Sequence, residues 1–363
     1  MPAEWELQDG IWLSWPHDED TFPDLAAVEE AYTAIIRRVA PHEQVNLLVR
    51  DPETEAHVRD LLQGNPGALK IHRIDYADVW FRDYGPTFLV NRERSGLAMV
   101  DWTFNAWGNK YPELLYDDII PSMMNRDLGI PRFSPGIVME GGSIDVNGRG
   151  TVLTTEQCLL NQNRNPWLDQ PAIERCLKEF LGCSHVVWLR EGIAGDDTDG
   201  HIDDIARFVH DTIIVCALEE DPDDENYAPL LENYRILQQA TDQDGSPLTI
   251  IPLPMPGYVG ENSRLPASYA NFLITNRAVL LPTFNHPHDR VAQRILMQAF
   301  PGREVHGIDC RAMVHGLGTI HCISQQQPAP LCRGNTGFVV SSQACSGKLP
   351  SHSSNRCPEG NIL

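Results

Sequence analysis

Apolar residues recur along most of the chain with two different periods. In five segments they follow the three- and four-residue spacing of an amphipathic helix, and these segments begin near Pro52, Pro112, Asp169, Asn226 and His288. A short aliphatic or β-branched run, typical of a strand, follows each segment, at residues 69–74, 130–133, 185–189, 248–252 and 303–308. The pattern therefore predicts an α/β protein in which helices and strands alternate.

The same pattern repeats along the chain. The predicted helices start 57 to 62 residues apart, and a loop glycine follows each predicted strand at a similar spacing, at Gly85, Gly142, Gly200, Gly260 and Gly318. We therefore predict five strand–loop–strand–helix units of about 58 residues. Closing such units into a ring protects the sheet edges and brings five loops to one central site, which predicts a five-bladed β/α propeller.

Both ends of the chain lie outside this repeat. The N-terminal 50 residues contain a predicted helix from about Asp24 to Val39 and a strand at Val45–Val49, which can complete the ring. Residues 331–363 are rich in Ser, Gly, Pro and Cys, follow neither period, and are predicted to be a poorly ordered tail. We therefore expect a single domain over residues 1–330.

The composition limits the classes of function. The 363 residues include 28 Lys and Arg against 50 Asp and Glu, a net charge of −22, which argues against nucleic acid as a partner and suits a small cationic ligand. The sequence shows no secretory signal and no apolar run long enough for a membrane span, so we expect a cytoplasmic protein that does not bind membranes. None of the nine cysteines forms a C-x-x-C pair, so neither a disulfide framework nor a zinc ribbon is indicated.

Several of the predicted loops carry polar residues that a fold alone does not require. Asp83 precedes the first loop glycine, Glu140 precedes the second, and Cys322 follows the last. His201 stands two residues before Asp203, a spacing that predicts both side chains on one side of a strand. Each residue alone has a structural interpretation, but together on equivalent loops they favour a functional site.

A cysteine, a histidine and several carboxylates in one place suggest a particular substrate. A nucleophilic cysteine reacts as its thiolate, and nearby carboxylates repel a thiolate unless a cation enters between them. A guanidinium is such a cation, because its planar fork of N–H donors matches two carboxylates. The pattern therefore predicts an enzyme that holds a guanidinium carbon over the sulfur of Cys322.

At these residues the sequence resembles the agmatine deiminase family, kin of bacterial peptidylarginine deiminase within the guanidine-modifying superfamily, over about residues 1–330. The matching segments are Met1-Pro-Ala-Glu-Trp5, Trp12-Leu-Ser-Trp15-Pro-His17, Asp78-Val-Trp-Phe-Arg-Asp83-Tyr-Gly-Pro86, Glu140-Gly-Gly142, Thr154-Thr-Glu-Gln-Cys158-Leu-Leu-Asn161, Asn163-Arg-Asn-Pro166, Asp197-Thr-Asp-Gly-His201-Ile-Asp203 and Ile320-His-Cys322-Ile-Ser-Gln-Gln-Gln-Pro328. The loop Gly316-Leu-Gly-Thr319 departs from the family, which usually has more glycine there and Asn before Ile-His-Cys.

The resemblance implies a role for each matching residue. Cys322 is expected to be the nucleophile, His201 the general acid and base, and Glu140 the residue that orients His201. Asp83 and Asp203 are expected to bind the guanidinium.

Two further residues are candidates at the substrate. The resemblance implies that Trp80 packs against it. Asn271, in Ser268-Tyr-Ala-Asn271-Phe, is a candidate residue at the border of the substrate site. A structural role at a turn or strand edge is an equal alternative for it.

The implied reaction is hydrolysis of a C–N bond in a linear amidine. Agmatine and water give N-carbamoylputrescine and ammonia through a Cys-thiouronium intermediate, a step of putrescine and polyamine biosynthesis. The implied fold is the five-bladed β/α propeller, with no metal and no organic cofactor. The expected partner is a small cationic guanidine, and a homo-oligomer is one expectation for the assembly.

Three alternatives stay open. The first is a deiminase of arginine or of C-terminal peptidyl-arginine. The second is an agmatinase-type manganese ureohydrolase, because Asp199-Gly-His201-Ile-Asp203 has a D-x-H-x-D spacing, although the other segments of that family are missing. The third is a non-catalytic guanidine-binding protein, which would have no need of the nucleophile Cys322.

Overall fold

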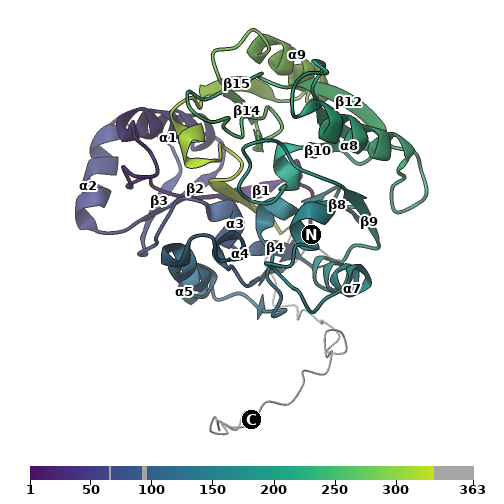
Figure 1. Cartoon of the computed structure of the whole chain (residues 1–363). Coiled ribbons are helices and arrows are strands. Elements are labelled where there is room, and N and C mark those ends of the chain that lie inside the picture. The colour runs from purple at the N-terminus through teal and green to yellow at the C-terminus, as the bar shows by residue number, and fades with distance from the viewer. Residues whose placement is uncertain (65–66, 92–95, 331–363) are drawn as a thin grey trace, which may run out of the picture.

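Five β-sheets form the framework of the protein, whose computed structural model describes residues 1–64, 67–91 and 96–330 (Figure 1). The first sheet has the strand order β16-β1-β2-β3, with bounds Ser324–Pro328, Gln8–Ser14, Gln44–Val49 and Leu69–Arg73. The other four sheets have three strands each: β4 Thr87–Val90, β5 Leu97–Val100 and β6 Arg132–Phe133; β7 Asp145–Val146, β8 Thr151–Thr155 and β9 His185–Leu189; β10 Ala206–His210, β11 Ile213–Leu218 and β12 Thr249–Pro254; β13 Leu273–Ile274, β14 Ala278–Thr283 and β15 Glu304–Asp309.

All five sheets share one order of strand directions. In each three-stranded sheet the middle strand pairs antiparallel with the strand before it and parallel with the strand after it. In the first sheet β1 pairs antiparallel with β16 and parallel with β2, so the two ends of the described chain meet in one sheet. The fold is therefore α/β and built on a fivefold internal repeat.

Helices make the crossovers between parallel strands, as parallel pairing requires. The longer ones are α1 Leu25–Val39, α2 Pro52–Leu61, α5 Ile120–Leu128, α7 Gln170–Leu181, α8 Tyr227–Gln239 and α9 Asp289–Ala299. In Figure 1 these helices lie around the outside of the molecule and the strands lie nearer its middle. No helix in the described ranges has the length and apolar character that crossing a membrane would require.

Most of the predicted elements are confirmed. Four of the five predicted helix starts lie within one residue of an observed start, and the helix and strand predicted within residues 1–50 are α1 and β2. The helix predicted from Pro112 is wrong over its first part, which is the 3-10 helix η1 Pro112–Ile119, and α5 begins only at Ile120. Pro121 has no N–H to donate to the carbonyl of residue 117, so an α-helix through this point would lack that bond. The predicted tail, residues 331–363, lies outside the described residues.

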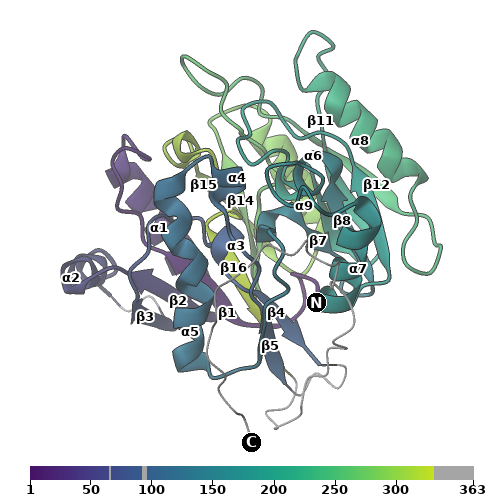
Figure 2. The ribbon, with the colours of Figure 1, turned by 60° about the horizontal axis from the view of Figure 1, so that its bottom comes forward.

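The connections between successive sheets carry the short elements that hold the polar candidates. Helix α3 Phe81–Tyr84 lies between β3 and β4, and the 3-10 turn η2 Gly141–Ser143 lies between β6 and β7. The turn η3 Ile202–Asp204 lies between β9 and β10, and η4 Met313–Gly316 precedes β16. Figure 2 shows α3 and β16 in the middle of the molecule, which is also where Figure 1 places α3.

Trp12 links the first and last strands of the chain. Trp12 is 1% exposed. The centroid of its ring lies 4.8 Å from that of His72 and 6.0 Å from that of Phe81. Its Nε1 donates to Oε1 of Gln327 on β16 at 2.9 Å. A side chain buried this fully stabilises the fold by both apolar contact and its hydrogen bond.

We predict that Trp12→Ala lowers the free energy of unfolding by about 3–5 kcal/mol, because it opens a cavity beside His72 and Phe81. Trp12→Phe keeps most of the ring contact and is expected to cost less than half as much. Urea denaturation followed by far-UV circular dichroism measures both values. Equal losses for the two variants would contradict the packing role of the ring.

Candidate active site

Cys322 lies in the connection between η4 and β16, at the base of a pocket. The pocket has a volume of about 420 Å³, and Trp80 and Asp83 line it together with the cysteine. Cys322 is 5% exposed, so only a small part of it faces the pocket. A ligand in this pocket can therefore touch the sulfur while most of the loop stays covered.

Asn271, from the connection between β12 and β13, organises the cysteine loop. Its side-chain oxygen accepts hydrogen bonds from Thr319 Oγ1 at 2.7 Å and from the backbone N–H of His321 at 3.0 Å. Its Nδ2 donates to Cys322 Sγ at 3.0 Å. Asn271 is fully buried and supports the nucleophile through these bonds. Of the predicted site residues, Trp80, Asp83 and Cys322 line the pocket, whereas Asn271, Asp203, His201 and Glu140 lie behind its lining.

Asp83 is fixed on α3 by bonds to two other loops. Its Oδ2 accepts from Trp107 Nε1 at 3.0 Å, and its Oδ1 accepts from the backbone N–H of Gly142 at 3.1 Å. Gly142 is essential to this arrangement, because a Cβ there would lie 2.6 Å from Nδ1 of His201, 2.9 Å from Oδ1 of Asp83 and 3.2 Å from Oδ2 of Asp203. Three predicted site residues thus surround one glycine.

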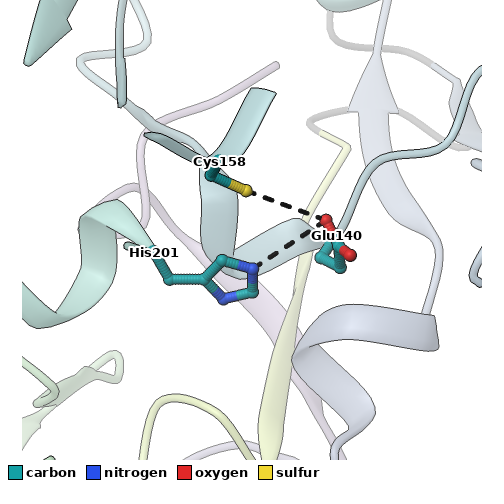
Figure 3. A group of neighbouring side chains, drawn as sticks. All are labelled: Glu140, Cys158 and His201. Atoms are coloured by element: carbon teal, nitrogen blue, oxygen red, sulfur yellow. Dashed lines mark hydrogen bonds and ion pairs between the residues drawn. The ribbon is translucent and has the colours of Figure 1, made fainter. Parts of the chain in front are cut away.

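His201 lies between the carboxylates of Asp83 and Glu140, and Figure 3 shows it beside Glu140 and Cys158. Its Nδ1 is 3.6 Å from Asp83 Oδ1 and its Nε2 is 3.9 Å from Glu140 Oε2, and within the described residues neither nitrogen has a hydrogen-bond partner. Glu140 is held from its other side by Arg164, whose Nε donates to Oε1 at 2.8 Å. The thiol of Cys158 lies 4.0 Å from Glu140 Oε2.

The charges around His201 set its protonation. Burial alone would lower the pKa of His201, but the Asp83 carboxylate, with Cys158 and Glu140, raises it well above its ordinary value. Burial would likewise raise the pKa of Glu140, and Arg164 more than offsets this, so the pKa of Glu140 is lowered. His201 is therefore an imidazolium facing ionised carboxylates, ready to donate a proton.

Asp203 meets the cysteine from the opposite side. Its Oδ2 lies 4.0 Å from Cys322 Sγ and 2.6 Å from Nδ1 of His321, while its Oδ1 is buried without a partner among the described residues. The prediction that His201 and Asp203 share a strand face is wrong, because both belong to the turn around η3 and β10 begins only at Ala206. The turn nevertheless brings both side chains to Gly142.

The carboxylates keep the thiol protonated in the absence of a ligand. Burial first, and then the charges of Asp203, Asp204 and Asp83, raise the pKa of Cys322 well above its ordinary value. Burial also raises the pKa of Asp83 to about 6, partly offset by His201. A cation entering between the sulfur and these carboxylates would reverse the effect on the thiol.

Two glycines allow the cysteine loop to pack against Trp80. A Cβ at Gly318 would lie 2.4 Å from the Trp80 ring, and one at Gly316 would lie 2.5 Å from the ring of Phe22. Leu317 between them has a φ of 71°, a left-handed conformation that glycine adopts more readily. This loop, where the sequence departs from the family pattern, therefore still takes up a glycine-like conformation.

Two groups of three side chains in the described ranges have potential metal-ligand atoms within 4.8 Å of one another. They are Glu140, Cys158 and His201, and Asp203, Asp204 and Cys322. Arg164 binds Glu140 and His321 binds Asp203, so each group already has a cationic partner that a metal ion would have to displace.

Sequence reasoning did not identify several residues of the site. Arg164 is the partner of Glu140 and was not among the candidate residues. Trp107 and His321 were also missed as partners of Asp83 and Asp203. Arg164 stands within the matching segment Asn163-Arg-Asn-Pro166, which was the available signal.

Comparisons with known proteins agree with this geometry. The model of the Porphyromonas-type peptidyl-arginine deiminase family matches residues 1–328. The agmatine deiminase of Stutzerimonas stutzeri is 36% identical over 92% of this chain and 96% of its own length, and that of Medicago truncatula is 38% identical over 91% and 96%.

Solved structures are similar over the same extent. The agmatine deiminase of Enterococcus faecalis has a TM-score of 0.85 and 32% identity, over 91% of this chain and 96% of that one. A cysteine-to-serine variant of the C. jejuni agmatine deiminase with substrate bound has a TM-score of 0.81 and 32% identity, over 90% and 95%. The chain therefore belongs to the Porphyromonas-type peptidyl-arginine deiminase family.

Proposed function

We propose that the protein is an agmatine deiminase, a hydrolase that converts agmatine and water to N-carbamoylputrescine and ammonia. The relatives that match nearly the whole chain carry this name. The observation that carries the proposal is the base of the pocket, where a buried thiol lies 4.0 Å from a carboxylate whose second oxygen has no partner among the described residues. That arrangement fits a flat cation with several N–H donors.

In the first half of the reaction, the guanidinium lies between Asp83 and Asp203 with its carbon over Cys322 Sγ. The positive charge of the substrate favours release of the thiol proton, and Asn271 Nδ2 stabilises the resulting thiolate. Sulfur attacks the carbon, and His201 gives its proton to one amino group, which leaves as ammonia. The enzyme then carries a thiouronium, and His201 is neutral.

In the second half, His201 takes a proton from water as the water attacks the thiouronium carbon. The C–S bond breaks, the remaining proton of the water goes to the sulfur and restores the thiol, and the neutral ureido product leaves with the oxygen of water. Glu140 keeps the His201 ring in place during both proton transfers, because Arg164 fixes this carboxylate from behind. Trp80 forms part of the wall against which the substrate packs.

The pocket mouth favours agmatine over arginine. Carboxylates of Asp18, Asp20, Glu113 and Asp197 line the pocket, and in the described ranges its lining contains no lysine or arginine. Arginine brings an α-carboxylate to this position, which these charges repel, whereas agmatine brings only an ammonium.

A manganese ureohydrolase has less support. The carboxylate of Asp199, part of the D-x-H-x-D spacing, accepts from Lys110 Nζ at 3.0 Å and also binds Arg164. It therefore faces two cations and lies outside both potential ligand groups of the described residues.

We also propose the larger organisation that the sequence predicts. The five sheets would be the blades of a closed propeller, with the β1–β16 pairing as the closing contact. Residues 1–330 would form one cytoplasmic catalytic domain that acts on a small guanidine without a cofactor, does not bind nucleic acid or membranes, and can assemble as a homo-oligomer.

We predict that the purified protein converts agmatine to equal amounts of ammonia and N-carbamoylputrescine, and that EDTA has no effect. Cys322→Ala is expected to lose at least about a thousandfold in kcat, because the nucleophile is gone. Cys216→Ala, which removes another buried thiol on β11, is the matched control and should keep full activity. Chromatographic product analysis decides the outcome, and urea with putrescine would contradict the proposal.

We predict that kcat/KM for agmatine falls as the pH is lowered through about 6, the pKa of Asp83 in the free enzyme. Below this pH the Asp83 carboxyl is neutral and no longer attracts the guanidinium. Asp78 also lines the pocket with a pKa of about 6, so Asp78→Asn is the control, and its acid limb should be unchanged. If the acid limb disappears in Asp78→Asn, the limb belongs to Asp78 and the assignment to Asp83 is wrong.

A further inference from the structure

Glu4, near the start of the sequence, reaches His321, the residue before Cys322. Its side chain is 7% exposed, and its Oε1 accepts the backbone N–H of Ile274 on β13 at 2.6 Å. Its Oε2 accepts from Arg207 Nη2 at 2.6 Å and lies 2.9 Å from Nε2 of His321. A carboxylate from the N-terminal segment is thus in contact with the residue that precedes Cys322.

His321 is held between two carboxylates. Its Nε2 faces Glu4 and its Nδ1 faces Asp203 Oδ2 at 2.6 Å. An ionised carboxylate can only accept hydrogen bonds, so each of the two carboxylates has a donor on His321 only when both ring nitrogens carry a proton. Glu4 is ionised, because Arg207 and His321 outweigh the effect of burial and hold the pKa of Glu4 well below its ordinary value.

The contacts form a line of alternating charges that ends at the substrate position. Asp145 binds Arg207 at 2.6 Å, Arg207 binds Glu4, Glu4 binds His321, and His321 binds Asp203. His321 occupies Oδ2 of Asp203 and leaves Oδ1 without a partner in the described part of the chain. The free oxygen is the one that can accept from a guanidinium.

We propose that Glu4 is a positioning residue of the active site, which holds His321 as an imidazolium and thereby keeps Asp203 ionised with its free oxygen toward the guanidinium. This inference rests on the proposed function, since it assigns Asp203 to the guanidinium. Glu4 acts only through His321 and does not line the pocket.

Several charged or titratable groups face Asp203 and influence its pKa. They are His321 and Cys322 before β16, His201 and Asp204 on its own turn, Arg207 on β10, and Arg82 and Asp83 on α3. Burial raises the pKa of Asp203, and the hydrogen bond and charge of His321 are the main opposing effects. Loss of the imidazolium therefore raises the pH at which Asp203 takes up a proton.

Glu4→Gln tests the proposal with little change in shape. When the amide oxygen accepts from the N–H of Ile274, the NH₂ group faces both Nε2 of His321 and Nη2 of Arg207, so Arg207 also loses an acceptor. Nε2 of His321 must become an acceptor, so the ring loses its charge. We expect a second acid limb of kcat/KM, set by Asp203 and lying below the Asp83 limb, to move up by about one pH unit, the size of losing one charged hydrogen bond. The loss should appear mainly in KM and only in acid buffer, and activity at neutral pH should stay near the wild-type value.

Two further variants separate positioning from a structural effect. Glu6→Gln, the same change two residues away, should keep the wild-type profile. Glu4→Gln combined with His321→Asn should move the limb no further than His321→Asn alone, because the two residues act in series. An equal loss at every pH, or additive shifts in the double variant, would overturn the proposal.

An NMR measurement without substrate tests the link between Glu4 and His321 independently of the proposed function. In protein labelled with ¹⁵N-histidine, His321, assigned with His321→Asn, should show two protonated ring nitrogens in the wild type and one in Glu4→Gln. If agmatine is not turned over but this signature changes as expected, the substrate is wrong and the Glu4–His321 link stands. An unchanged signature refutes the link, whatever the substrate is.

Discussion

Two buried carboxylates next to the pocket, Glu140 and Asp203, each have a basic side chain from another part of the chain as a partner. Arg164 pairs with Glu140, and His321 pairs with Asp203. A buried charge is costly unless it is paired and hydrogen-bonded, so these pairs can form only when the loops are in place. The pairing therefore determines both the position of each carboxylate and the side that it turns toward the pocket.

The pairs also explain how five separate connections build one site. Each connection between sheets contributes one part: α3 supplies Asp83, η2 follows Glu140, the turn η3 contains Asp203, and the last two connections supply Asn271 and Cys322. The fivefold repeat brings these connections together, and the hydrogen bonds between them fix distances that the repeat alone does not. Gly142 shows how close this approach is, because no side chain fits there.

The sequence predicted the repeat and the candidate residues because both depend on local patterns. Helical and strand periods are visible in the residue spacing, and the motifs around Asp83, His201 and Cys322 are contiguous. The partners could not be predicted in the same way. Arg164 lies 24 residues from Glu140, and His321 lies 118 residues from Asp203, and no local period links such positions. The strand predicted at His201 is a turn, because the backbone N–H groups of Gly200 and His201 donate to the side chain of Asp196.

Glu4 extends this argument to the first residues of the chain. Its contact with His321 spans 317 residues, so the N-terminal segment reaches the same site as the last connection. The segment Met1-Pro-Ala-Glu-Trp5 matches the family, and its match gives no hint of chemistry until the structure places Glu4 beside Arg207 and His321. A residue can therefore belong to an active site through the charge of its neighbour alone. In this molecule the neighbour is His321, whose two ring nitrogens face Glu4 on one side and Asp203 on the other.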